Sequence, residues 1–284
     1  MKLNEIHLRD PFILNDNGKY YLYGTRGREC TGPFTGSDVF TSDDLENWSD
    51  AKEVFTPPKD FWGTEDCWAP EVHKYNGKYY MLVSFNSPLH CRGTQILMSD
   101  SPEGPFEPVS DKPLTPPDWE CLDGTLYIDK NNKPFLIFSH EWTQIQIGEM
   151  CAVPLSDDLS EPVGEPIILF KADEPSWSDG LDHKSKKIYV TDGPFMYRKA
   201  DGQLVMIWSS FCNSQYVEAI AVSDNGEIDG NWIHSEKFLL GHDSGHGMLF
   251  RDNNGKLKLT LHSPNTLSKE RPCIIDVDEN SLSL

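Results

Sequence analysis

Apolar and polar positions alternate along this chain in short runs, and one arrangement of these runs recurs five times. Each copy opens with a polar or acidic residue, continues as an apolar run of strand length, turns at residues rich in Asn, Asp, Gly and Lys, and returns as a second apolar run. The Asn-Gly turns at 17–18 and 76–77 are strong hairpin signals. The pattern therefore predicts five β-hairpins, which begin at Asp10, Ala69, Asp123, Asp192 and Gly245.

A second element follows the hairpin in the first four copies. It consists of a Ser-Asp turn and a later apolar run, and it begins at Thr41, Met98, Leu155 and Val222. Two inner and two outer strands make a four-stranded antiparallel unit, and radial repetition of such units leaves only short, protected edges. We therefore predict an all-β fold, a five-bladed β-propeller of four-stranded antiparallel blades, as a single domain over residues 1–284. We expect the tail from Arg271 onward, helped by residues near Ile6, to complete the fifth blade.

A β-sandwich whose hairpins resemble one another by accident is the alternative, because Asn-Gly turns between aromatic strands are common in all-β proteins. Five copies, four of them with the same following element, favour the propeller. The 21 Gly and 20 Pro are spread along the whole chain, which suits many short strands and marks no linker between domains.

Charge and cysteine usage exclude several classes of function. The formal net charge of −20 repels phosphate backbones and anionic headgroups, so we expect no nucleic-acid partner and no membrane partner. Residues 1–11 are polar where a signal peptide needs an apolar run of about 7 to 15, so we expect a cytoplasmic protein, although a chain trimmed of its signal would look the same. The seven cysteines contain no Cys-x-x-Cys pair, so neither a disulfide framework nor a thiolate zinc site is indicated.

Reactive side chains stand at the starts of the predicted inner strands. The first strand of each propeller blade lines the central axis, so the residues that open these strands are expected to meet around one pocket. Asp10, Asp123 and Asp192 open three copies, residues 68–71 (Trp-Ala-Pro-Glu) open the second, and His246 opens the fifth. A single Asp at a strand start also has a structural explanation, because it binds backbone N–H groups in turns. Three of them at equivalent steps of the repeat favour a shared site.

Converging carboxylates are what the hydrolysis of a glycosidic bond requires. One must stay ionised to activate water, and another must stay protonated to assist the leaving oxygen. Repulsion between neighbouring carboxylates raises the pKa of at least one of them, which supplies the protonated partner. The sequence has no GxGxxG, P-loop, HExxH or GxSxG motif, so nucleotide, zinc-protease and serine-hydrolase chemistry lacks support.

Several motifs resemble glycoside hydrolase family 43 in order, spacing and blade position. They are residues 9–13 (Arg-Asp-Pro-Phe-Ile), 68–72 (Trp-Ala-Pro-Glu-Val) followed by 76–80 (Asn-Gly-Lys-Tyr-Tyr), and 123–125 (Asp-Gly-Thr). The resemblance covers essentially the whole chain. It implies an inverting mechanism in which Asp10 is the general base that activates water, while Asp123 tunes the pKa of the acid and orients it. It also implies arabinofuranosidase, arabinanase or xylosidase activity.

The general acid departs from the pattern of the family. Family members usually open the fourth blade with Glu, any residue and Pro, whereas residues 192–194 here read Asp-Gly-Pro. An Asp carboxylate sits one methylene further back than that of Glu, so either the backbone advances, another residue donates the proton, or catalysis is impaired. Glu141, directly after the second strand of the third copy, is the alternative acid, unless it is a surface charge beside a packing Trp.

Further side chains are candidates for holding a sugar or a metal. Trp68, Glu71, His140, Trp142 and His246 are the expected substrate-binding residues, although the two Trp rings would also suit the core. The resemblance implies that His246 holds a central calcium ion through water. The alternative is a neutral imidazole bonded to an axial carboxylate or to water, since calcium prefers oxygen ligands. No other cofactor is expected.

The sequence thus predicts a glycosidase, an exo-acting α-L-arabinofuranosidase or β-xylosidase whose partner is a small oligosaccharide that contains arabinose or xylose. The alternative is a carbohydrate-binding propeller whose catalysis is impaired by the Asp at position 192. The two differ in whether a bound glycoside is cleaved.

Overall fold

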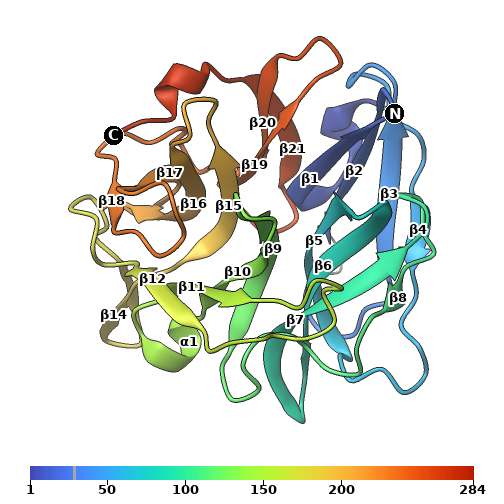
Figure 1. Cartoon of the computed structure of the whole chain (residues 1–284), viewed down its shortest axis with the longest axis horizontal. Coiled ribbons are helices and arrows are strands. Elements are labelled where there is room, and N and C mark those ends of the chain that lie inside the picture. Colours follow the sequence, from blue (N-terminus) through green and yellow to red (C-terminus); the bar gives the residue numbers. More distant parts are fainter. Residues whose placement is uncertain (28–29) are drawn as a thin grey trace.

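The computed structural model describes residues 1–27 and 30–284. Its antiparallel sheets are arranged radially about one axis (Figure 1), which confirms the five-bladed β-propeller. The first blade contains β1 (Leu8–Asp16), β2 (Lys19–Arg26), β3 (Ser37–Ser42) and β4 (Lys52–Phe55). The second contains β5 (Glu65–Tyr75), β6 (Lys78–Ser87), β7 (His90–Ser99) and β8 (Glu107–Pro108).

The third and fourth blades repeat this order from the axis outward. The third contains β9 (Cys121–Ile128), β10 (Pro134–His140), β11 (Glu149–Pro154) and β12 (Ile167–Lys171). The fourth contains β15 (Asp192–Arg198), β16 (Leu204–Cys212), β17 (Gln215–Ser223) and β18 (Trp232–His234). A short helix, α1 (Trp142–Ile145), follows β10, and a separate hairpin of β13 (Leu181–His183) and β14 (Lys186–Ile188) precedes the fourth blade.

The fifth blade departs from the prediction, because three strands form its sheet in the described part of the chain: β19 (Gly245–Arg251), β20 (Leu257–Ser263) and β21 (Arg271–Asp276). The tail supplies β21 as expected and then ends in the 3-10 helix η2 (Glu279–Ser281). The segment near Ile6 adds no strand, since it begins as the 3-10 helix η1 (Leu3–Glu5). It closes the ring through side chains instead: Arg271 Nε donates to the carbonyl of Asn4 at 3.1 Å, and Ile6 is buried.

Apolar side chains fill the spaces between adjacent blades. Phe85 of β6, Phe138 of β10 and Trp208 of β16 are fully buried at three of these interfaces. Met248 and Phe250 of β19 join the cluster of the first blade, which completes the ring. The inner strands β1, β5, β9, β15 and β19 each contact the next around the axis. Among the described residues, no helix is both long and apolar enough to cross a membrane.

Every inner strand carries the same irregularity near its start. Pairing with the second strand of the blade shifts register at this point, which is the mark of a β-bulge, and a bulge re-aims the side chains around it. One residue of each bulge has a positive φ; these residues are Asp10 (52°), Ala69 (46°), Asp123 (56°), Gly193 (49°) and His246 (53°).

The bulges show that the predicted alignment of the five copies was off by one residue in the fourth blade. The counterpart of Asp10 and Asp123 in the fourth blade is Gly193, and Asp192 lies one residue earlier. Asp192 therefore shares the position of Arg9 and Trp68, which directly precede the bulges of their own blades. The three carboxylates come from two neighbouring steps of the repeat.

In four of the five blades, a polar side chain on the second strand of the preceding blade binds the bulge N–H. Each of these acceptors lies on a second strand, directly opposite the residue that precedes the bulge in its own blade. The pairs, from acceptor to backbone N–H, are Thr25 to Ala69 (2.7 Å), Ser84 to Asp123 (2.9 Å), Ser209 to His246 (2.7 Å) and His262 to Asp10 (3.2 Å). These buried contacts connect neighbouring blades at the height of the site.

Candidate active site

A cavity of about 300 Å³ opens at the bulged end of the inner strands, and most of the predicted site residues line it. The three Asp residues line it together with Glu141, Trp68, Trp142 and His246. Glu71 and His140 are not among the lining residues. The carboxylate of Glu71 lies 2.9 Å from His73 Nε2, and the ring of His140 stacks on Trp119 with centroids 4.2 Å apart.

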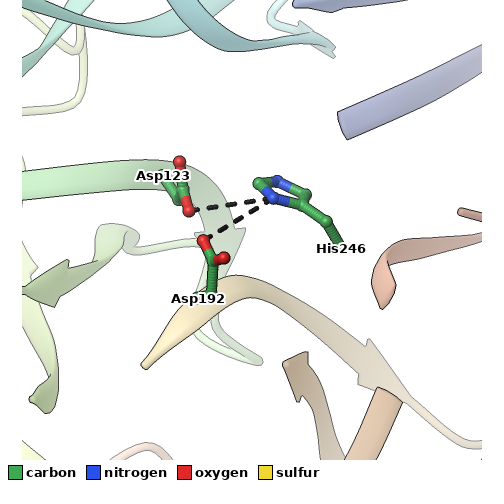
Figure 2. Close-up of side chains that lie close together, drawn as sticks. All are labelled: Asp123, Asp192 and His246. Atoms are coloured by element: carbon green, nitrogen blue, oxygen red, sulfur yellow. Dashed lines mark ion pairs between the residues drawn. The ribbon is translucent and has the colours of Figure 1, made fainter. Parts of the chain in front are cut away.

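His246 brings the three carboxylates together. Its Nδ1 lies 3.2 Å from Asp10 Oδ1, 3.7 Å from Asp192 Oδ1 and 3.8 Å from Asp123 Oδ2. Figure 2 shows Asp123 and Asp192 pointing at this nitrogen from β9 and β15, the inner strands of two neighbouring blades. The predicted convergence of carboxylates on an axial imidazole is therefore present.

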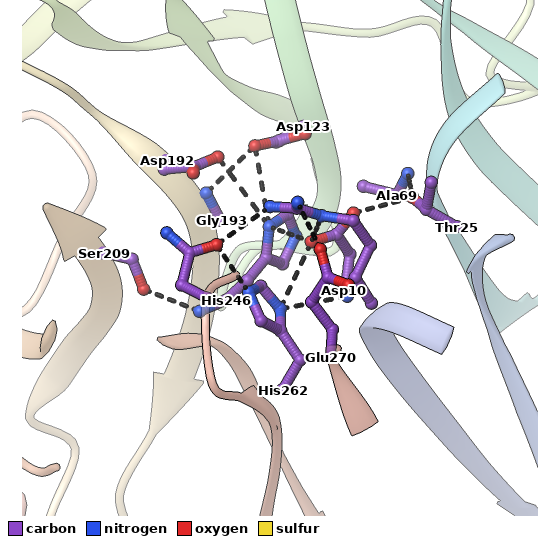
Figure 3. A network of polar contacts seen from close by, with 12 residues as sticks. Asp10, Thr25, Ala69, Asp123, Asp192, Gly193, Ser209, His246, His262 and Glu270 are labelled. Atoms are coloured by element: carbon purple, nitrogen blue, oxygen red, sulfur yellow. Dashed lines mark hydrogen bonds and ion pairs between the residues drawn. The ribbon is translucent and has the colours of Figure 1, made fainter. Parts of the chain in front are cut away.

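Asp10 is held as an ionised carboxylate. Burial by itself would raise its pKa, but His246 and Arg9 oppose this, and the pKa of Asp10 falls below its ordinary value. Thr25 Oγ1 donates to Asp10 Oδ2 at 2.6 Å (Figure 3). Arg9 Nε lies 3.4 Å from Asp10 Oδ1. A buried carboxylate that keeps its charge is suited to accept a proton.

Residues of the fifth blade bind Arg9 and the backbone of Asp10. Arg9 Nη1 donates to Glu270 at 3.0 Å, and its Nη2 donates to Asn265 at 3.2 Å. Burial lowers the pKa of His262 to about 4, so this imidazole is neutral. Its Nδ1 accepts the N–H of Asp10, which leaves Nε2 to donate to Asn265 Oδ1 at 3.1 Å.

Asp123, unlike Asp10, favours the protonated form. Burial, together with the neighbouring carboxylates of Asp192 and Asp10, raises the pKa of Asp123 well above its ordinary value. The N–H of Gly193 donates to its Oδ2 at 3.1 Å, and this bond lowers the pKa only in part. Two buried carboxyl groups on one imidazole thus have pKa values pushed in opposite directions, so one favours the ionised form and the other the protonated form, and acid and base catalysis needs both forms.

Asp192 is the most accessible of the three carboxylates. Its side chain is 23% exposed, compared with 7% for Asp10 and 6% for Asp123. The hydroxyl of Tyr216 donates to its Oδ2 at 2.6 Å, and the pKa of Tyr216 is raised by burial and by Asp192, so this phenol stays a donor. Asp192 is the carboxyl group best placed to meet a group that enters from solvent.

Four residues that touch the site were not foreseen as parts of it. Arg9 belongs to the first motif, and Thr25 occupies the same step of its blade as Ser209, so the repeat held a signal for both positions. Tyr216 and Arg92 lie on β17 and β7, outside the inner hairpins, and the repeat gives no signal for them. Arg92 Nη1 donates to Glu141 at 2.6 Å.

The site fits a metal ion only in part. Asp123, Asp192 and His246 each offer one ligand atom within 4.8 Å of the others. Calcium takes 6 to 8 oxygen ligands, so these two carboxylates would leave most of its coordination to water, and an imidazole nitrogen would reach it best through water. A calcium ion held by His246 through water stays a prediction.

Comparison with known proteins places this geometry in a family. A family model described as glycosyl hydrolases family 43 matches residues 4–274. The chain belongs to this family. The predicted family is therefore confirmed.

Solved structures and curated relatives support the assignment. An endo-arabinase from Bacteroides thetaiotaomicron is 40% identical to this family 43 chain, with a TM-score of 0.92, over 98% of this chain and 96% of that one. An endo-1,4-β-xylanase from the same organism is 28% identical, with a TM-score of 0.76, over 97% and 92%. The extracellular endo-α-(1→5)-L-arabinanase 1 of Bacillus subtilis is 29% identical over 157 residues, which are 52% of this chain and 47% of that protein.

A second curated relative is named for two activities. The xylosidase/arabinosidase 43A of Humicola insolens is 26% identical over 152 residues, which are 49% of this chain and 46% of that protein. The chain thus spans about half the length of the curated relatives it matches.

Proposed function

We propose that this protein is an inverting glycoside hydrolase that cleaves arabinose-containing oligosaccharides, with xylose-containing ones as the second choice. The observation that carries the proposal is the pair of opposite pKa shifts at Asp10 and Asp123 around His246, in one cavity with Asp192. The names of the relatives support arabinose first, because an endo-arabinase is 40% identical over nearly the whole chain.

In the proposed reaction Asp10 accepts a proton from a water molecule while the oxygen of that water attacks the anomeric carbon. Asp192 donates a proton to the glycosidic oxygen, the bond from that oxygen to the anomeric carbon breaks, and the new hydroxyl stands on the opposite face of the sugar. Asp123 lies against Asp192 and its raised pKa keeps a proton at this end of the site. Asp10 then releases its proton to solvent and Asp192 regains one.

Asp192 is preferred to Glu141 as the acid on two grounds. Asp192 contacts the proton-holding Asp123 and is the more solvent-exposed member of that pair, whereas Glu141 is bound to the guanidinium of Arg92. The side chain of Asp192 is one methylene shorter than that of Glu. In this proposal Asp123 and Tyr216, which both contact Asp192, compensate for the shorter side chain, and no second acid is needed.

A panel of nitrophenyl glycosides tests the proposal. We expect release from the α-L-arabinofuranoside first, from the β-D-xyloside second, and none from a galactoside. Product analysis on arabinan oligosaccharides then decides between exo action, which gives monomer from the start, and endo action, which gives a ladder of fragments. Binding without release from any glycoside would leave the carbohydrate-binding alternative.

A calcium ion held through water by His246 is a separate proposal. It is supported by the placement of Asp123, Asp192 and His246 around one point. Calorimetry with calcium on the chelator-treated protein tests it, and binding that disappears in His246→Ala is the expected result. Unchanged binding in this variant would place any calcium elsewhere.

A further inference from the structure

We propose that Glu141 binds hydroxyl groups of the substrate and determines specificity, and that Arg92 is the positioning residue that joins Glu141 and Trp68 into one wall of the cavity. The inference rests on the proposed function, because it assigns a recognition role within the same cavity. It gives Glu141 a task other than proton donation.

Arg92 of β7 is held on three sides. Its Nη1 donates to Glu141 Oε2 at 2.6 Å, and its Nη2 donates to Asp66 Oδ2 at 3.0 Å. The guanidinium carbon lies 4.1 Å from the centre of the Trp68 ring, within the range of a cation–π contact. Only a planar guanidinium can satisfy two carboxylates at its fork while stacking on a ring, so Lys is not an equivalent residue here.

The partners of Arg92 are themselves fixed. Asp66 accepts the N–H of Gly32 at 2.8 Å and the side-chain amide of Asn86 at 3.3 Å. The backbone N–H of Arg92 donates to the carboxylate of Glu120 at 2.9 Å, and the N–H of Glu141 donates to the Glu120 carbonyl at 2.8 Å. The wall therefore joins the first three blades and is ordered before any ligand arrives, which lowers the entropic cost of binding.

The carboxylate of Glu141 can still accept hydrogen bonds from a ligand. Burial raises the pKa of Glu141, while Arg92 and the hydroxyl of Thr143 counteract that rise. A carboxylate has about four acceptor sites on its two oxygens, so these two neighbours leave room for hydroxyl donors. Glu141 and Trp68 both line the cavity that contains Asp10 and Asp192.

The chemistry of this wall matches a sugar. An ionised carboxylate accepts hydrogen bonds from hydroxyl groups, and an indole ring packs against the apolar C–H face of a sugar ring. Because a site built to bind a hydroxyl leaves its acceptor unpaired with a deoxy analogue, it discriminates strongly against that analogue. We therefore assign to Glu141 the recognition of pentose hydroxyls next to the reacting bond.

The test pairs protein variants with substrate analogues. Glu141→Ala and the wild type are compared on an aryl arabinofuranoside and on its 2-deoxy, 3-deoxy and 5-deoxy analogues. We expect the variant to lose about 10- to 100-fold in kcat/KM on the parent, with the loss mainly in KM, and to equal the wild type on one deoxy analogue. The same loss on every analogue, or a loss that grows as the leaving group becomes poorer, would overturn the assignment.

Arg92→Lys separates positioning from charge. We expect it to raise KM on the parent by about 10-fold and to leave the preference among leaving groups unchanged. Arg26→Lys is the matched control, because Arg26 binds Asp38 through a similar fork at 2.6 and 2.7 Å outside the cavity. Equal effects of the two changes on KM would show a stability effect and contradict the assignment.

The failure of this inference can be told apart from the failure of the proposed function. If the wild type cleaves no glycoside, the proposed function is wrong, and the same variants are compared by calorimetry with arabinose and its deoxy analogues. Loss of arabinose binding in Glu141→Ala, without loss for one deoxy analogue, then supports the wall. Unchanged binding of arabinose overturns it.

Discussion

The backbone N–H of Gly193 donates to Asp123 Oδ2 at 3.1 Å, in the position where the other four blades use a side chain from a second strand. Ser139 lies opposite Leu122 at the corresponding step of the third blade but does not take this role. The junction of the third and fourth blades is thus connected by a residue of the site itself. Catalytic geometry and blade contact depend on the same hydrogen bond here.

Replacement of Gly193 should therefore damage the site more than the fold. Its φ is +49°, and a Cβ atom would lie 2.8 Å from His246 Cγ, so we expect Gly193→Ala to displace the imidazole and lower kcat/KM by roughly 10²-fold. Gly202→Ala is the control, because its φ is +92° but no atom lies within 4 Å of an added Cβ. That change should cost about 1 kcal/mol in stability without loss of activity. Equal activities of the two variants would contradict this prediction.

Thr25 should influence the pH at which kcat/KM falls on the acidic side of its pH profile. It donates to Asp10 Oδ2 and accepts the N–H of Ala69, so Thr25→Val removes one of the contacts that lower the pKa of Asp10. Because the base must be ionised, the acidic limb of kcat/KM should move to higher pH. Thr25→Ser keeps the hydroxyl and should restore the wild-type limb; a limb that stays in place in Thr25→Val would refute the role of this contact.

Buried Glu218 should make the stability of the fold depend on pH. It accepts from Ser209 Oγ at 2.8 Å and from the N–H of Gly247 at 3.0 Å, and burial raises its pKa to about 8 from an ordinary value of 4.5. The folded state then holds a proton that the unfolded state has lost, so the free energy of unfolding falls as pH rises from about 4.5 to 8.

Glu218→Gln keeps the shape without the titration. We expect the variant to gain stability relative to the wild type across that interval and to keep a constant difference above it, as measured by denaturant unfolding at several pH values. Glu46→Gln, at a side chain that is 78% exposed, removes the same charge from the surface and serves as the control. A constant difference between Glu218→Gln and wild type from pH 4 to 9 would show that Glu218 is ionised in the fold.

The repeat made much of this architecture predictable. Hairpins with turn residues at regular steps specify blades, and the starts of inner strands must meet at the axis, so Asp10, Asp123 and His246 were placed correctly. The bulge was not predictable, because a one-residue irregularity leaves the apolar pattern unchanged while it moves Asp192 one step from Asp10. Glu71 lies on the other side of its bulge, after it, and pairs with His73 instead of lining the cavity.

Arg92 shows the other limit of prediction from sequence. It lies at the start of an outer strand, where neither periodicity nor motif marks it, and it reaches the cavity wall only because the second and third blades pack side by side. Contacts between blades depend on the three-dimensional ring, and a repeat within one blade does not encode them.

The dependence of rate on the leaving group tests the central claim most directly. Asp192→Asn and Asp10→Asn are compared on a nitrophenyl arabinofuranoside and on an unactivated arabinose disaccharide. If Asp192 is the acid and Asp10 the base, Asp192→Asn should lose about 10² to 10⁴ in kcat on the disaccharide and little on the nitrophenyl substrate, whereas Asp10→Asn should lose activity on both. An equal loss on both substrates in Asp192→Asn would contradict the account, because a residue that donates the proton must matter most where the leaving group needs it.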